Sequence, residues 1–418
     1  MRKEDERKAT RRDFLKKAGL AAGTVTAISL VGNVRSGETG PLKVGLVGCG
    51  GRGTGAAVDC MRAAPNVKVT AVADLFRERA EAAKRRLNEQ GAEIKDDHVF
   101  HGFDAYKQLM ETDVDIVILA TPPGFRPEHF EAAVNARKHV FMEKPIAVDP
   151  VGCRRVMAAG EKAKELGLAV VAGTQRRHQR SYIETINRIK DGAIGDIVAA
   201  RAYWCQGGLW VVERRPEWSD MEWQIRNWLY FTWLSGDHIV EQHIHNLDVI
   251  NWVMGTHPVR AMGMGGRQVR TAPKYGNIYD HFTVDYEYPN GVHMLSMCRQ
   301  IDGCANIVAE FVVGTKGGSN CSGNIWGQNP WQYRGPNPNP YVEEHKDLIE
   351  SIRKGEPINE TQAVAESTMT AIMGRESAYT GKVVTWDEMM RSDLSLAPKE
   401  YKFGPLPVAP VAMPGRPM

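Results

Sequence analysis

The sequence lacks a strong charge bias, and it lacks the cysteine spacing of a zinc site or a disulfide framework. Its 418 residues contain 53 Lys and Arg against 50 Asp and Glu, and the basic residues are scattered beyond the N-terminus. The pattern shows no phosphate-backbone footprint, so we expect no nucleic-acid partner. The seven cysteines form no C-x-x-C pair. An odd, dispersed set of this kind argues against both disulfides and structural zinc.

A membrane-anchoring apolar run is also missing near the N-terminus. The apolar stretch Ala18–Val31 is short and rich in Gly and Ala, so we expect no stable membrane anchor. It follows Arg11, Arg12 and Phe14-Leu15-Lys16, an order that resembles a twin-arginine export signal. The resemblance implies the twin-arginine export machinery as a partner and a periplasmic or secreted location, with residues 1–40 as signal and linker. A basic N-terminal helix is the alternative.

Beyond the N-terminus the chain is long enough for two domains. Over residues 41–172, short apolar runs alternate with helical patterns, which is typical of βαβ units around a parallel sheet buried on both faces. The expected strands cover residues 43–47, 68–73, 115–119, 139–142 and 169–171. The expected helices cover residues 54–63, 77–88, 127–136 and 151–166.

The texture changes after about residue 180, where longer strands and hairpins begin. The expected strands cover residues 197–203, 281–288, 292–299 and 305–313, and helices are expected at 341–354 and 361–380. An Asn290-Gly291 pair predicts a hairpin between two of these strands. Residues 173–390 thus predict an α+β domain with an open, largely antiparallel sheet, whose exposed face suggests a homo-oligomer. Residues 322–339 predict a loop, and residues 391–418 an extended tail.

A glycine-rich turn, Gly48-Cys49-Gly50-Gly51-Arg52-Gly53, directly follows the first expected strand and precedes a helix. In this context Gly48 can make the tight turn, Gly50 can let the backbone approach a pyrophosphate, and Gly53 can pack the helix on the strand. The helix N-terminus then binds the anion. The turn predicts that residues 41–172 are a dinucleotide-binding Rossmann domain, with Gly51 and Arg52 in the same site.

Two further positions at the sheet edge belong to this predicted site. Asp74 ends the second strand, where a carboxylate can accept hydrogen bonds from both hydroxyls of the adenosine ribose, which favours NAD over NADP. Arg77 keeps NADP open, since a guanidinium could pair with a 2′-phosphate. Thr121 and Pro122 end another strand at the same edge, where they either contact the nicotinamide half or merely end the strand.

Phe141-Met142-Glu143-Lys144-Pro145 places a charged pair at the end of a buried strand. Together with the glycine turn and Gly381-Lys-Val-Val-Thr-Trp386, it resembles the glucose-fructose oxidoreductase, inositol dehydrogenase and MocA-like (Gfo/Idh/MocA) family over about residues 42–390. The resemblance implies an NAD(H)-dependent oxidoreductase acting on a CH-OH group of a sugar or polyol. It further implies that Lys144 reaches the reacting hydroxyl and the nicotinamide ribose, beside Glu143. An ammonium there stabilises a developing alkoxide.

The second half of the expected site lies on one helix, predicted over residues 236–252. Glu241, His245, Asp248 and Trp252 are spaced to share one helical face. The resemblance implies that His245 is the general base, a role that suits an imidazole with a pKa near neutrality. Related enzymes usually carry Asp where this chain has Glu241, so Glu241 is expected to act in catalysis, to bind substrate or only to cap a helical turn.

The same helix carries a histidine-rich cluster that invites a metal interpretation, formed by His238, Glu241, His243 and His245. Positions 243 and 245 point to different faces of a helix, and the family works without a metal, so we expect none.

Several polar and aromatic side chains are further candidates for binding the substrate. Gln175, Arg176 and Arg177 follow the last parallel strand and can donate hydrogen bonds to sugar hydroxyls, or they are an ordinary connector. Tyr279 is a weaker candidate. The tryptophans of residues 204–233 could stack on a sugar ring, although most such residues belong to a core or an interface.

An exported enzyme could not draw on a pool of free NAD, because free NAD is not expected outside the cytoplasm. We therefore expect NAD(H) to be tightly bound. The plain dehydrogenase has two rivals. One is a redox-neutral glycosidase or coupled sugar oxidoreductase that restores its cofactor in each cycle. The other is an inactive sugar- or nucleotide-binding homologue.

Overall fold

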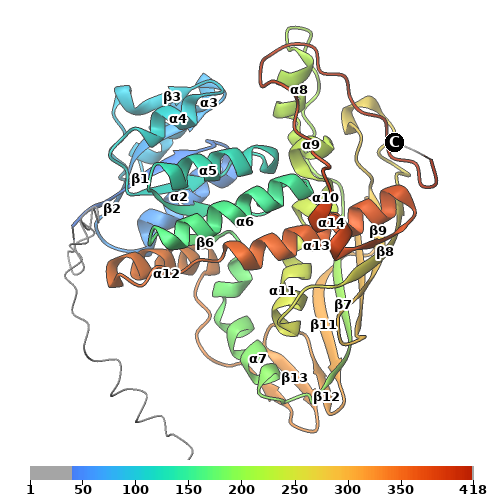
Figure 1. Ribbon diagram of the computed structural model, residues 1–418. Helices are drawn as coiled ribbons and strands as arrows, with labels where there is room; N and C mark the ends of the chain where they lie inside the picture. The colour runs from blue at the N-terminus through green and yellow to red at the C-terminus, as the bar shows by residue number, and fades with distance from the viewer. Residues whose placement is uncertain (1–39, 417–418) are drawn as a thin grey trace, which may run out of the picture. The chain divides into compact units, whose positions relative to one another are not determined.

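The computed structural model describes residues 40–416, and the expected export signal lies outside them (Figure 1). The first sheet has six strands in the order β3-β2-β1-β4-β5-β6, and all its pairs are parallel. Its strands are β1 (Leu42–Val47), β2 (Val67–Asp74), β3 (Val99–His101), β4 (Ile116–Leu119), β5 (His139–Met142) and β6 (Val170–Ala172). This order reverses between β1 and β4, and ligands of doubly wound sheets bind at such a reversal. The Rossmann prediction is confirmed.

Both faces of this sheet are buried, which is why its strands read as continuous apolar runs. In β4, Ile116 and Ile118 join one core, whereas Val117 and Leu119 join the other. Helices α4 (Ala105–Met110), α5 (Arg126–Asn135) and α6 (Pro150–Glu165) cover the latter face. The former face is covered by α2 (Gly51–Ala63) and α3 (Arg77–Asn88). The short β3 and α4 escaped the sequence analysis.

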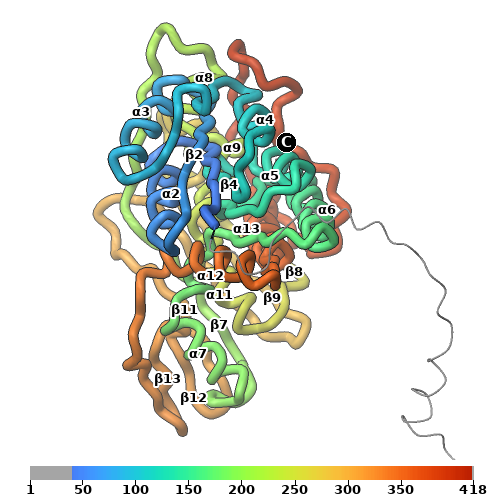
Figure 2. Tube along the Cα trace, turned by 90° about the vertical axis from the view of Figure 1, so that its left-hand side faces the viewer, coloured from blue at the N-terminus to red at the C-terminus, as the bar shows by residue number. Residues whose placement is uncertain are grey.

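A helix from the far end of the chain completes the core of this domain. Helix α12 (Pro340–Lys354) buries Leu348, Ile349 and Ile352 in the same apolar cluster as Ala56 and Ala57 of α2. Both views show α12 beside the Rossmann domain (Figures 1 and 2). The sequence placed this helix in the second domain, because contiguity along the chain was the only guide.

The second sheet has nine strands in the order β14-β13-β12-β11-β7-β10-β9-β8-β15. They are β7 (Ile197–Gln206), β8 (Arg260–Gly266), β9 (His281–Glu287), β10 (His293–Gln300), β11 (Ile307–Gly314), β12 (Gly317–Ser319), β13 (Asn324–Gly327), β14 (Trp331–Gln332) and β15 (Val383–Thr385). All neighbours are antiparallel except β7 and β10. The predicted hairpin joins β9 to β10 at Gly291, whose φ is +76°.

The loop predicted over residues 322–339 is wrong in part, because β13 and β14 lie within it. These strands are four and two residues long, respectively, at the sheet edge, where backbone pairing suffices and Asn and Gly are tolerated. Helix α13 (Thr361–Thr380) packs on the inner face of the sheet, while Met262 and Met264 of β8 are exposed on the outer face. Residues 392–416 form neither helix nor strand, as expected of the tail. No helix in the described range is long and apolar enough to cross a membrane.

One fully buried guanidinium ties the two domains together. Arg375 of α13 donates hydrogen bonds to the carbonyls of Val148 (2.7 Å) and Gly236 (3.1 Å), and it pairs with Glu376 at 2.8 Å. Val148 follows Lys144 by four residues in the segment after β5, and Gly236 precedes the histidine-rich segment. A buried charge satisfied in this way stabilises the fold mainly because removing it leaves its partners unpaired.

Replacing Arg375 by Leu should lower the free energy of unfolding by about 3–5 kcal/mol, because two buried carbonyls and a buried carboxylate lose their donor. Urea denaturation followed by tryptophan fluorescence measures the change. The control is Arg391→Leu, which removes an exposed i,i+4 pair with Asp387 and should cost less than about 0.5 kcal/mol. Equal costs for the two variants would contradict the role given to Arg375.

Candidate active site

A cavity of about 770 Å³ opens where β1, β2 and β4 end, and the whole glycine turn lines it. A Cβ on Gly48 would lie 2.5 Å from the backbone nitrogen of Thr121, and one on Gly53 would lie 1.9 Å from the carbonyl oxygen of Gly48. These two glycines are therefore required for the turn itself. At Gly50 and Gly51, by contrast, a Cβ would meet nothing within 4 Å. The turn thus leaves open space in front of the N-terminus of α2, which fits a pyrophosphate.

Asp74 lies in the same cavity and is fixed by the backbone. Its carboxylate accepts hydrogen bonds from the backbone nitrogens of Cys49 (2.7 Å) and Phe76 (2.8 Å), and burial raises its pKa. Both oxygens keep lone pairs for ribose hydroxyls. Arg77 instead pairs with Glu81 at the surface, whereas its neighbour Arg79 is one of the cations that line the cavity. The position of Arg77 gives no support to NADP binding.

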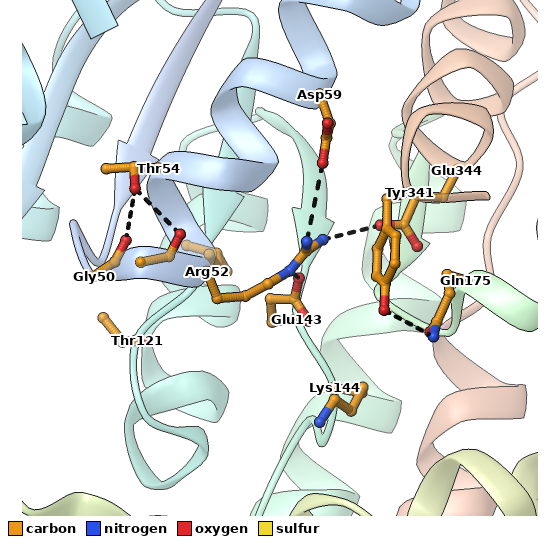
Figure 3. Close-up of polar contacts among 12 residues, drawn as sticks. Gly50, Arg52, Thr54, Asp59, Thr121, Glu143, Lys144, Gln175, Tyr341 and Glu344 are labelled. Atoms are coloured by element: carbon orange, nitrogen blue, oxygen red, sulfur yellow. Dashed lines mark hydrogen bonds and ion pairs between the residues drawn. The ribbon is translucent and has the colours of Figure 1, made fainter. Parts of the chain in front are cut away.

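Arg52 does not face the glycine turn but crosses to the neighbouring strand and helix. Its guanidinium pairs with Glu143 after β5 and with Glu344 of α12 (3.2 Å), and it lies 4.7 Å from the centroid of the Tyr341 ring (Figure 3). Burial lowers the pKa of Arg52, whereas the charges of the two carboxylates raise it, and the net result is a raised pKa. Arg52 is thereby held at the wall between two cavities and lines both.

The second cavity, of about 270 Å³, contains all three residues predicted to be catalytic. Lys144, Glu241 and His245 line it, together with the predicted Glu143 and Gln175. The cavity shares Ala120, Thr121 and Trp228, as well as Arg52, with the larger one. Pro122 lines only the larger cavity. The residues that the sequence analysis assigned to cofactor and to chemistry therefore lie in two adjoining spaces.

The predicted helix over residues 236–252 is wrong in one respect, because it is broken in two. Helix α10 (His238–Glu241) ends, and α11 (Ile244–Met254) begins after a short interruption. The backbone nitrogen of His245 donates to Gln242 (3.3 Å) and not to Glu241, as it would in a continuous helix. The carbonyl of Glu241 is free to accept a hydrogen bond from Lys144 Nζ at 2.7 Å. Periodicity did not show this break, because Glu241 and His245 stay on one side of the chain.

Lys144 is held by a single residue of the other domain. Its Nζ also contacts Glu241 Oε1 at 3.0 Å, and both side chains are nearly buried. An ammonium has three donors, so two are used by Glu241 and one is left for a ligand oxygen in the cavity.

His245 is a buried imidazole packed flat against Trp204, with ring centroids 5.6 Å apart and an interplanar angle of 22°. Burial and, after it, the charge of Lys144 hold the pKa of His245 well below 6.5. The ring is therefore neutral at pH 7 and can accept a proton.

The other two histidines of the cluster point elsewhere. His243 Nε2 lies 2.7 Å from Ser296 Oγ on β10, and the His238 ring packs against Phe282. Among residues 40–416, no group of three or more His, Cys, Asp or Glu is arranged to hold a metal ion.

Some predicted substrate residues lie outside both cavities. Arg177 forms a two-pronged pair with Asp248, with contacts of 2.9–3.1 Å, and Arg176 pairs with buried Glu310. Tyr279 is buried, and its hydroxyl donates to the carbonyl of Ala412 at 2.9 Å. The structure thus gives these three side chains partners in the protein and places them outside the two cavities, which the pattern of donors near the last strand did not indicate.

Other residues line the cavities without having been singled out for these positions. Arg126 is fully buried and donates to the carbonyls of Leu119 (2.5 Å) and Thr121 (2.7 Å), so it holds the turn after β4 in place. Tyr341, at the start of α12, accepts a hydrogen bond from Gln175 at 3.2 Å. Of the tryptophans, Trp210 and Trp228 reach a cavity, whereas Trp223 lies in an apolar cluster.

Comparison with known proteins agrees with this geometry. Residues 42–172 match the family described as "Oxidoreductase family, NAD-binding Rossmann fold", and residues 182–319 match "GFO/IDH/MocA C-terminal domain". The chain belongs to the Gfo/Idh/MocA oxidoreductase family. Its first domain is the NAD-binding Rossmann domain of that family.

The names of the relatives that this chain matches refer to different compounds. The 2,7-anhydro-N-acetylneuraminate hydratase of Escherichia coli K12 is 30% identical over 178 residues, which cover 43% of this chain and 44% of that protein. Inositol 2-dehydrogenase of Salmonella typhimurium LT2 is 29% identical over 213 residues, covering 51% and 54%. The chain therefore matches about half the length of these relatives.

A solved structure covers more of the chain. Aldose-aldose oxidoreductase from Caulobacter crescentus, complexed with glycerol, aligns with a TM-score of 0.66 at 20% identity, over 82% of this chain and 99% of that one. At this identity the likeness shows a shared fold.

We predict that the His245 imidazole titrates well below pH 6.5 in this Gfo/Idh/MocA protein, because burial and the Lys144 charge oppose its protonation. Lys144→Met should raise that pKa while burial still keeps it below 6.5, and Lys144→Arg should leave it low. Nitrogen-15 NMR of labelled histidine measures all three. A His245 signal that titrates near 6.5 in the parent protein would contradict the buried, neutral ring.

Proposed function

We propose that this protein is an NAD(H)-dependent oxidoreductase that acts on a CH-OH group of a sugar or polyol. The observation that carries the proposal is the meeting of a neutral imidazole and an ammonium in a small cavity that shares a wall with the dinucleotide cavity. Removing hydrogen from a carbinol needs a proton acceptor and a cation at the oxygen, and these two side chains supply both.

The chain's own residues divide the work as follows. A ring nitrogen of His245 accepts the proton of the substrate hydroxyl, and the remaining N–H of Lys144 stabilises the negative charge that develops on the oxygen. Glu241 fixes the ammonium through its carbonyl and carboxylate. The glycine turn and Asp74 would hold NAD, which would supply the hydride acceptor for the carbinol carbon. The acid at Asp74 supports NAD over NADP.

The substrate class follows from the size and polarity of the second cavity. At about 270 Å³ it has room for a single small ring, and Gln175, Glu241 and Lys144 offer donors and acceptors to hydroxyl groups. Trp228 on the same wall gives a surface for the apolar C–H face of such a ring. The name of the relative inositol 2-dehydrogenase describes a substrate of this kind.

A redox-neutral cycle is the second candidate, with NAD(H) tightly bound. Two relatives support it by name: a hydratase, which adds or removes water without net oxidation, and an aldose-aldose oxidoreductase, in which donor and acceptor are both sugars. The expected export signal supports it as well, because a cofactor carried out of the cytoplasm has no external pool to exchange with.

The proposed function predicts that protein purified without added nucleotide releases NAD(H) on denaturation, and that Lys144→Met lowers kcat/KM by about 10²-fold or more without releasing it. Turnover of a polyol and sugar panel, followed at 340 nm and by product analysis, measures the loss. Lys382→Met, at an exposed position, is the matched control.

Each outcome of this experiment decides between candidates. Net NADH formation selects the dehydrogenase. Cleavage of a nitrophenyl glycoside, or exchange between two sugars, with no net NADH selects the redox-neutral cycle. A parent protein that neither contains nor binds nucleotide rejects both enzymes in favour of an inactive homologue, and a fully active Lys144→Met protein rejects the role of Lys144.

The location and assembly of the protein belong to the same proposal. Export by the twin-arginine machinery rests on Arg11 and Arg12, and cell fractionation of the parent and an Arg11→Lys, Arg12→Lys variant tests it. A homo-oligomer rests on the apolar outer face of the second sheet, where Met262 is 64% and Met264 70% exposed. Light scattering after size-exclusion chromatography should give a mass above the 46.4 kDa monomer.

A further inference from the structure

The outer wall of the dinucleotide cavity is made by segments that lie outside the Rossmann domain. Besides the glycine turn and Asp74, this cavity is lined by Arg226 of helix α8 (Asp220–Arg226) and by Tyr401 of the C-terminal tail. Both residues lie outside residues 42–172, the part of the chain that matches the NAD-binding Rossmann fold. The contacts of Arg226 and Tyr401 show how α8 and the tail come to line the cavity.

The tail reaches the cavity through aromatic side chains. Phe403 stacks on Phe76, with centroids 6.1 Å apart and an interplanar angle of 14°, and it also contacts Phe103 at 5.1 Å. Tyr401 packs against Phe125 at 5.2 Å. The three contacted phenylalanines all line the cavity. The tail thus covers the rim of the dinucleotide site itself.

Helix α8 contacts the same rim through Arg226. The guanidinium of Arg226 lies 3.7 Å from the centroid of the Phe76 ring and pairs with Glu78 of α3 at 2.9 Å. Phe76 follows Asp74 by two residues and donates a backbone hydrogen bond to its carboxylate. Two elements from outside the Rossmann domain therefore meet at the loop that presents the expected ribose partner.

The tail is also hydrogen-bonded to α8, so the two segments are joined to each other beside the cavity. The amide of Leu406 donates to Asp220 (3.1 Å), and Gln224 donates to the carbonyl of Leu406 (2.6 Å). The tail runs past α8 before it returns toward the second sheet (Figure 1).

We propose that Arg226, Tyr401 and Phe403 form a clasp over the adenosine end of the dinucleotide site, so that NAD(H) is retained through many turnovers as a resident group. This inference rests on the proposed function and adds residues that the Rossmann fold does not supply. Because the clasp spans the rim, the dinucleotide leaves only when the tail separates from Phe76 and Phe103.

The clasp predicts that Phe403→Ala speeds the release of bound NADH by tenfold or more. The experiment uses the full chain loaded with NADH and follows the fall in its fluorescence after an excess of NAD is added. Arg226→Gln, on the other element, should speed release as well. Val408→Ala, at a position 42% exposed in the same tail, is the matched control and should release NADH at the parent rate.

The outcomes separate this inference from the function on which it rests. Equal release rates for the parent, Phe403→Ala and Arg226→Gln proteins overturn the clasp, and so does a parent protein that binds NADH but loses it within seconds. In both cases the oxidoreductase proposal stands. A parent protein that binds no NADH overturns the proposed function and the clasp with it. Thermal melting of the variants without nucleotide shows whether faster release reflects the lost contact or a damaged fold.

Discussion

The interruption of the helix after Glu241 fixes the position of the reactive ammonium, and much of the site depends on it. A continuous helix would use the carbonyl of Glu241 internally, whereas the break turns it toward Lys144. The contact joins the end of β5 in one domain to the end of α10 in the other. The geometry of the chemistry is therefore set by how the domains meet, and buried Arg375 holds Val148 and Gly236 on either side of that junction.

Burial and the charge of Lys144 both lower the pKa of His245, so the site contains a neutral imidazole. An exposed imidazole would be partly protonated near neutral pH, but this ring is packed on Trp204 close to an ammonium. Below its pKa the site would hold two adjacent cations and no base. The interior is thus arranged to keep one positive charge and one proton acceptor side by side.

The sequence was a good guide wherever a local rule decides the structure. Buried parallel strands give continuous apolar runs, the glycine turn has a steric cause at Gly48 and Gly53, and the Asn-Gly hairpin is a two-residue rule. It failed where distant partners decide. The pairing of Arg177 with Asp248 removes it from the cavity, and the contact of Phe403 with Phe76 joins segments at opposite ends of the chain. No periodicity carries that information.

The contribution of α12 to the Rossmann core has a consequence for how the molecule is made. The apolar face of α2 is covered by Leu348, Ile349 and Ile352, which are synthesised long after it. The first domain therefore emerges from the ribosome with part of its core open to water, and it closes only when most of the chain has been translated. The domain that is first in the sequence thus depends for its core on a helix that is synthesised after most of the second domain.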